Sequence, residues 1–348
     1  MAADMGASPK GDRMDEQRGL KYGELPGLRF ACVLDGRGGA RNLGWEEARH
    51  WQTSQGVLWI HLERGVPEAH RWLLEESGIN PVMCEAMLAA ESRPRIEDVE
   101  DALLAVPRGV NAGATGRDAL DLIPLHMWID ANRVISLREK DHFLLALRDI
   151  REALAIGKGP TTSGDLFVRI ADKLVRDVEP VLAALDDEVD NLDDQLQELD
   201  SETARHRLGD LRRRSIHLRR YLAPQREALF RLQVEEMPWL GRRDKIHLRE
   251  VTDKVLRYVE SLDTTRDRTT ILHDDLTALV SERISKNAHR LTAVAAILLP
   301  PSLIAGVLGA NVGGIPGSDD PWAFAVLVVV IALVFPVELW VLRRLGWL

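Results

Sequence analysis

The chain has 348 residues, of which 28% are charged and 45% hydrophobic, and its mean hydropathy is −0.14. These averages exclude a protein made mostly of membrane spans and also a disordered chain. The formal net charge is −9, which argues against a nucleic-acid partner because such proteins present a basic face. Two cysteines, Cys32 and Cys84, are too few for a disulfide framework or a cysteine-based zinc site.

The N-terminal part of the chain predicts a short tail followed by an α/β domain. Residues 1–26 are polar and charged without an apolar segment, which indicates a flexible tail and not a signal peptide. Residues 27–160 alternate short β-like runs with helical patterns, so we expect a cytoplasmic α/β domain whose strand order stays open. The expected strands are Leu28–Leu34, Val57–Leu62, Ala102–Val106, Ile123–Ile129 and Val134–Leu137, and the expected helices are Trp45–Gln52, Pro67–Ser77 and Pro81–Ala90.

Residues 161–240 predict a helical hairpin of two oppositely charged helices. From Asp165 to Leu199, apolar residues recur at helical spacing and the polar face is acidic. The stretch from Glu202 to Leu222 is rich in arginine. An antiparallel pair of an acidic and a basic helix accounts for both patterns. The acidic run also fits a solvated face or a cation site, and the sequence leaves these two explanations open.

Residues 241–290 predict a stalk helix that continues into the membrane. There is neither glycine nor proline between Gly241 and Pro300. A helix from about Lys245 to Leu308 would be roughly 95 Å long at 1.5 Å per residue. Its mixed surface requires neighbours, and packing against copies of itself around a wet axis fits better than a dimeric coiled coil with a dry seam.

Residues 291–348 predict a transmembrane domain with two helices, about 291–310 and 322–342. Each apolar stretch approaches the roughly 20 residues that a helix needs to cross the hydrocarbon layer. Lys286 and Arg290 precede the first span, Arg343 and Arg344 follow the second, and the loop between them has no lysine or arginine. By the positive-inside rule, both termini face the cytoplasm.

The first span ends in an unusual segment of small residues that leads to Asn311. Small residues such as Ser302, Gly306 and Gly309 either let helices approach closely or leave room for a water-filled pore. The amide carbonyl of Asn311 can accept hydrogen bonds from the water shell of a cation without trapping the ion. An asparagine that caps the helix end is the alternative, and the residues alone favour neither.

The segment Gly309-Ala310-Asn311 and the following Val-Gly-Gly-Ile-Pro-Gly at 312–317 resemble the CorA superfamily of divalent metal-ion transporters. More narrowly, they resemble its ZntB zinc-transporter branch, because the magnesium-transporting branch carries Gly-Met-Asn here and Ala310 departs from it. The resemblance covers the chain from about Leu28 to the C-terminus. Four further segments carry it: Arg108–Asn111, Met127–Ile129, Leu248–Glu250 and Arg257–Glu260.

This resemblance implies a homopentamer in the cell inner membrane, in which five copies of the first span line a pore for divalent cations. Asn311 would hold a hydrated cation at the outer mouth, next to Gly309 and Ala310. Asp319 and Asp320 in the outer loop would attract cations, or else serve only the solubility of the loop. Helical spacing back from Asn311 places five further pore-lining candidates on one side: Gly306, Ser302, Leu299, Ala295 and Leu291.

The prediction of which ion is transported rests on the resemblance to the ZntB branch. The spans contain no cysteine or histidine, so no inner-sphere metal site is predicted, no cofactor is expected, and a hydrated ion fits best. Zinc uptake is the first expectation, with magnesium, cobalt or nickel as alternatives. Proton coupling has two candidate sites, Glu338 and His289, although Glu338 also fits a side chain that reaches the headgroup region.

Two function classes remain at this stage. No nucleophile, base and orienting group cluster in the sequence, so an enzyme is not expected. A pentameric cation transporter is the first class, and a membrane-tethered interaction or sensory protein is the alternative.

Overall fold

The computed structural model describes residues 25–90, 93–113, 121–309 and 321–344, and for residue 323 only the backbone. The chain divides into two compact units. The first, here called the N-terminal unit, comprises Met1–Asp194 and His206–Thr270. The second, the C-terminal unit, comprises Gln195–Arg205 and Ile271–Leu348.

A seven-stranded sheet forms the centre of the N-terminal unit, in the order β2-β1-β3-β9-β8-β5-β4. The central pair β3 and β9 is parallel, and its register places His61 beside Ser136. The other neighbours are antiparallel. The strands are β1 (Leu28–Leu34), β2 (Ala40–Leu43), β3 (Val57–Glu63), β4 (Ile96–Val99), β5 (Ala102–Ala105), β8 (His126–Ile129) and β9 (Arg133–Arg138).

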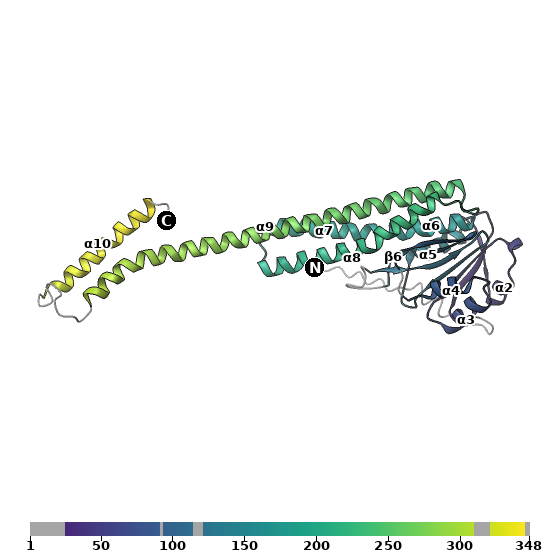
Figure 1. The fold of residues 1–348 in the computed structure, drawn as a ribbon, viewed down its shortest axis with the longest axis horizontal. Coiled ribbons are helices and arrows are strands. Elements are labelled where there is room, and N and C mark those ends of the chain that lie inside the picture. The colour runs from purple at the N-terminus through teal and green to yellow at the C-terminus, as the bar shows by residue number, and fades with distance from the viewer. Residues whose placement is uncertain (1–24, 91–92, 114–120, 310–320, 345–348) are drawn as a thin grey trace. The chain divides into compact units, whose positions relative to one another are not determined.

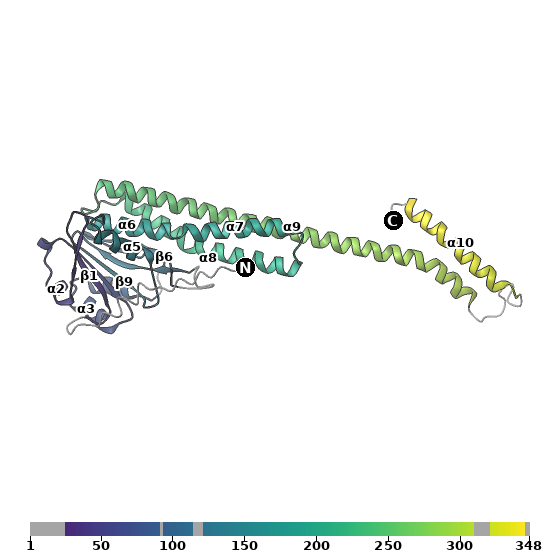
Figure 2. The ribbon, with the colours of Figure 1, turned by 180° about the vertical axis from the view of Figure 1, so that it is seen from behind.

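Helices cover both faces of this sheet, which confirms the α/β prediction (Figures 1 and 2). On one face lie α2 (Trp45–Arg49), the 3-10 turn η1 (Thr53–Gln55) following it in sequence, α3 (Pro67–Glu75) and α4 (Pro81–Leu88). Trp45 and Trp72 meet edge to face there, with ring centres 5.2 Å apart. On the other face lie α5 (Leu145–Ala155) and α6 (Ser163–Arg176). Arg151 of α5 is held over the ring of Phe30 at 4.6 Å.

The expectation of one strand over Ile123–Ile129 is wrong. Pro124 has no backbone N–H to donate to a ladder, and the chain changes sheet at this point. Residues Leu122–Pro124 form β7, which pairs with β6 (Arg108–Val110) in a separate two-stranded ribbon, whereas β8 joins the large sheet.

The expectation of one acidic helix over Asp165–Leu199 is also wrong, because two helices occupy this stretch. α6 ends at Arg176 and α7 spans Glu179–Gln195. The break coincides with Pro180, a residue that the first turn of a helix tolerates and a helix interior does not. α8 (Ser201–Val234) runs beyond the expected end at Leu222 and contains Pro224. α9 (Arg242–Leu308) confirms the long uninterrupted helix, and α10 is Ala323–Arg344.

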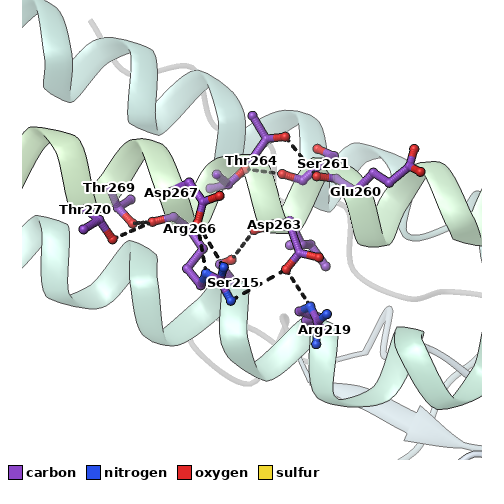
Figure 3. Close-up of polar contacts among 12 residues, drawn as sticks. Ser215, Arg219, Glu260, Ser261, Asp263, Thr264, Arg266, Asp267, Thr269 and Thr270 are labelled. Atoms are coloured by element: carbon purple, nitrogen blue, oxygen red, sulfur yellow. Dashed lines mark hydrogen bonds and ion pairs between the residues drawn. The ribbon is translucent and has the colours of Figure 1, made fainter.

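Side-chain bonds connect α7, α8 and α9 within the N-terminal unit. Arg214 of α8 pairs with Glu188 of α7 at 2.5 Å, as expected for an acidic and a basic helix. Figure 3 shows the contacts of α8 with α9, where the Ser215 hydroxyl donates to the Leu262 carbonyl at 2.9 Å. Arg219 lies 2.6 Å from Asp263. The acidic and basic helices therefore both bond to the long helix as well as to each other.

Candidate ion-conducting segment

The five pore-lining candidates that precede Gly309 all lie on the last turns of α9, inside the C-terminal unit. Leu291 is 72% exposed and Leu299 is 68% exposed. Ala295, Ser302 and Gly306 are exposed as well. Their spacing of three and four residues puts them on one side of the helix. No described residue covers this face, which is therefore open to lipid or to another chain.

Two positions at the end of α9 are occupied by glycine for different reasons. A Cβ at Gly309 would lie 2.7 Å from the Ala305 carbonyl oxygen, to which the Gly309 N–H donates at 2.8 Å. The helix end itself therefore requires glycine at this position. A Cβ at Gly306 would meet nothing within 4 Å. No contact with the described residues explains Gly306, so its small size suits either a neighbouring chain or an open passage.

Two hydroxyl groups near the candidate face bond back to their own helix. The Ser302 hydroxyl donates to the Leu298 carbonyl at 2.6 Å, and the Thr292 hydroxyl donates to the Ala288 carbonyl at 2.9 Å. Each hydroxyl has one hydrogen and two lone pairs, so its outward side can only accept. Such a group suits the outward-pointing hydrogens of a cation's water shell. Sequence reasoning missed Thr292, although its position three residues before Ala295 was a usable signal.

Two successive prolines lie inside the first span. Pro300 and Pro301 have no N–H, so the carbonyls of Ala296 and Ile297 lose their usual donors four residues later. α9 continues through both prolines to Leu308. Transmembrane helices tolerate proline because neighbouring groups or water can satisfy the freed carbonyls.

The remaining candidates are spread over the chain. Glu338 is on α10, and both of its carboxylate oxygens are buried without a hydrogen-bond partner among the described residues. His289 is exposed on α9 ahead of the first span. Ala310, Asn311, Asp319 and Asp320 lie outside the described residues.

Metal-binding side chains do not gather in the described ranges. Within residues 25–90, 93–113, 121–309 and 321–344, no group of three or more histidine, cysteine, aspartate or glutamate side chains could hold a metal ion. The chemistry that this segment offers is therefore that of hydroxyl, carbonyl and apolar groups along one helix face.

Among the described residues, two helices are apolar and long enough to cross a membrane. One is the end of α9, and the other is Phe324–Arg344 in α10. Very little of either apolar stretch is buried inside the protomer, unlike the core helix of a soluble protein. Together with the folded N-terminal unit, these helices are those of a membrane protein with two C-terminal transmembrane helices.

The chain belongs to the family of CorA-like Mg²⁺ transporter proteins, whose model matches residues 54–344. It is 36% identical over 329 residues to the divalent cation transporter CmaX of Pseudomonas aeruginosa, covering 94% of this chain and 98% of that protein. It is 32% identical over 323 residues to the zinc transport protein ZntB of Pectobacterium atrosepticum, covering 92% and 96% respectively.

Solved structures agree with this assignment. The structure of full-length CmaX matches with a TM-score of 0.80 at 34% identity and covers 94% of this chain and 100% of that one. The CorA magnesium transporter of Methanocaldococcus jannaschii matches with a TM-score of 0.78 at 20% identity, covering 91% and 98%. The resemblance to the CorA superfamily and its ZntB branch is confirmed. The chain is a transporter of divalent cations and not an enzyme.

Proposed function

We propose that this chain takes up zinc through a homopentameric pore in the cell inner membrane, with both termini in the cytoplasm. The observation that carries the proposal is the uncovered face of α9 from Leu291 to Gly306, which leads directly to Asn311. Similarity to ZntB proteins supports zinc as the ion. The positive residues that precede the first span and follow the second support the cytoplasmic placement of both termini.

In this proposal the pore passes a hydrated cation. Five copies of Asn311 hold the water shell at the outer mouth, beside Gly309 and Ala310, and Asp319 and Asp320 raise the local cation concentration. Further along, the Ser302 hydroxyls accept hydrogen bonds from the same shell, and Ala295 and Gly306 leave room for it. Leu299 and Leu291 form apolar constrictions that close the pore by excluding water.

Proton coupling is assigned to Glu338, with His289 as the second site. A carboxylate within an apolar span is costly unless it serves an ion or proton path. Its two oxygens have no hydrogen-bond partner in the described part of the protomer, which leaves them able to take up a proton.

Metal flux into liposomes that contain the purified protein tests the proposal. Zinc, magnesium, cobalt and nickel are compared side by side, with and without a proton gradient. We expect zinc to enter, and we expect Asn311→Ala to reduce entry severely while size-exclusion chromatography still shows a pentamer. Asn191→Ala on α7 is the matched control and should leave entry unchanged. Intact pentamers without flux of any divalent ion would refute the proposal.

Two further variants test gating and proton coupling separately. Leu299→Ala should change gating without abolishing entry, and unchanged conductance would remove Leu299 from the constriction. Glu338→Gln should abolish the response to a proton gradient and leave entry without the gradient intact. A gradient response that persists in this variant would exclude Glu338 as the proton site.

Magnesium is the second candidate ion. The matching family model is described by Mg²⁺ transport, and CmaX is named only for divalent cations. Magnesium entry faster than zinc entry in the same liposomes would favour this alternative, and Asn311→Ala should reduce it in the same way.

A further inference from the structure

The last turn of α10 combines two arginines with an exposed tryptophan. The guanidinium carbon of Arg344 lies 5.3 Å from the centre of the Trp340 ring. Trp340 itself is 61% exposed. Arginine stacks on aromatic rings and retains its planar fork of N–H donors, and tryptophan favours the boundary between hydrocarbon and water. The ring therefore holds the guanidinium group at the level where α10 leaves the membrane.

No carboxylate neutralises these two arginines in the described part of the chain. Glu338 precedes Arg343 by five residues, but its carboxylate oxygens are buried and bond to neither arginine. Arg290, at the start of the first span, also has no acidic partner among the described residues. Lys286 differs, because Glu282 pairs with it at 2.6 Å.

We propose that Arg343, Arg344 and Trp340 form a binding site for the phosphate group of an anionic phospholipid, and that Arg290 makes the same kind of contact from α9. Guanidinium groups bind phosphate through two parallel hydrogen bonds, and arginines that no carboxylate of the described residues neutralises favour a headgroup with net negative charge. The proposal rests on the proposed orientation, because both helix ends must lie at one leaflet to meet the same lipids. It does not depend on which ion is transported.

Lipid retention tests this site without using transport as the readout. The full-length protein is placed in nanodiscs of phosphatidylcholine mixed with phosphatidylglycerol, and the lipids that remain bound are counted by native mass spectrometry. We expect the wild type to retain phosphatidylglycerol preferentially. Each arginine at an anionic surface contributes about a fivefold preference, so Arg343→Gln combined with Arg344→Gln should lower retention about 25-fold. The exposed pair Arg71→Gln and Arg226→Gln in the N-terminal unit removes the same charge and should change nothing.

Two additional measurements keep the test decisive. Arg343→Lys combined with Arg344→Lys retains the charge but loses the planar fork, so it should lower retention about threefold and serves if the glutamine variants do not assemble. Free inorganic phosphate should not displace the lipid at matched ionic strength. Unchanged retention in both arginine variants, an equal loss in the control pair, or displacement by phosphate would overturn the proposal. Zinc flux in matching liposomes is recorded separately, so a failed transport function and a failed lipid site give different results.

Discussion

Polar side chains serve different purposes in the two units. In the N-terminal unit they connect different helices, as when Thr265 of α9 donates to Asp186 of α7 at 2.6 Å. In the C-terminal unit the hydroxyls of Ser302 and Thr292 bond only to carbonyls of their own helix. Side chains of the N-terminal unit thus join helices of one protomer. On the apolar part of α9 the two hydroxyls bond locally, both oxygens of Glu338 on α10 have no partner among the described residues, and the helix faces stay exposed.

Leucines along α9 show the same contrast. Leu248 and Leu262 are 0% exposed, whereas Leu291 and Leu299 on the same helix are among its most exposed residues. Helix propensity is equal at all four positions, so the difference comes entirely from what surrounds the helix. One part of α9 is a core helix of a folded domain, and the other is built to be covered from outside the protomer.

Asn311→Ala, described above, carries the largest expected effect on transport. The largest expected effect on stability is that of Leu248→Ala, which should lower the free energy of unfolding of the N-terminal unit by about 2–5 kcal/mol, because it opens a cavity in a close-packed core. Leu298→Ala on the exposed part of α9 should change the same quantity by less than about 0.5 kcal/mol. Urea unfolding followed by tryptophan fluorescence measures both. Equal losses would contradict the distinction between the two parts of α9.

Asp172 of α6 tests the bonds that join helices in the N-terminal unit. It accepts from Lys254 of α9 at 2.7 Å and from Arg176 at 2.8 Å. Burial by itself would raise the pKa of Asp172, but the bonds from Lys254 and Arg176 outweigh it and hold the pKa below the ordinary 3.8. Asp172→Asn should lower the free energy of unfolding by about 1–3 kcal/mol near neutral pH.

The pH dependence of that loss follows from the sign of the shift. A lowered folded-state pKa stabilises the fold above the ordinary pKa of 3.8, and this contribution disappears as the pH falls through the lowered value. The difference between wild type and Asp172→Asn should therefore shrink in acid unfolding below about pH 4. Asp187→Asn, an exposed position on α7, is the control and should show no difference at any pH.

His126 of β8 predicts a second pH dependence of stability, located at the sheet. Burial, as the largest cause, and the nearby arginines Arg64, Arg95 and Arg108 together lower its pKa to about 3. Between its ordinary pKa of 6.5 and this value, the unfolded chain binds a proton that the folded chain does not. Stability should fall by up to about 1.4 kcal/mol per pH unit as the pH drops below 6.5. His126→Leu should reduce this slope, and an unchanged slope would exclude His126 as its source.

The smallest expected effects concern hydroxyls on the open face of α9. Ser302→Ala and Thr292→Val should each reduce divalent-cation flux about two- to tenfold, because each removes a hydrogen-bond acceptor worth about 0.5–1.5 kcal/mol. Thr270→Val is the control, since Thr270 bonds back to Arg266 in the same way but belongs to the N-terminal unit. Stopped-flow flux with a metal-sensitive dye measures all three. A similar loss in Thr270→Val would show that back-bonding, and not the position on this face, matters.

Long uniform patterns were predictable, and short or interrupted ones were not. α9 was expected almost to its ends because glycine and proline are absent from Gly241 to Pro300. β1 was expected with its observed bounds because Leu28–Leu34, apart from Arg29, is an apolar run between turn residues. The break between α6 and α7 was missed, although Pro180 marks it, because the apolar spacing resumes in phase on the other side. The spacing placed the five candidate pore residues on one side of α9, and their role in a pore stays a prediction, because other residues of this helix, Val294, Leu298 and Leu303, are exposed as well. The position of Thr292 was readable from the sequence, but its bond to the Ala288 carbonyl was not.

The sequence by itself determined the two apolar spans, the long helix and the motif at 309–317, because each depends on residues that are close together in the chain. Only the tertiary structure decided which distant residues meet. The parallel pairing of β3 with β9, the transfer of Leu122–Pro124 to a second sheet and the partners of Asp186 are of this kind. Such pairings depend on the simultaneous packing of several elements that are distant in the sequence. The local periodicity of one element does not indicate which other element it packs against.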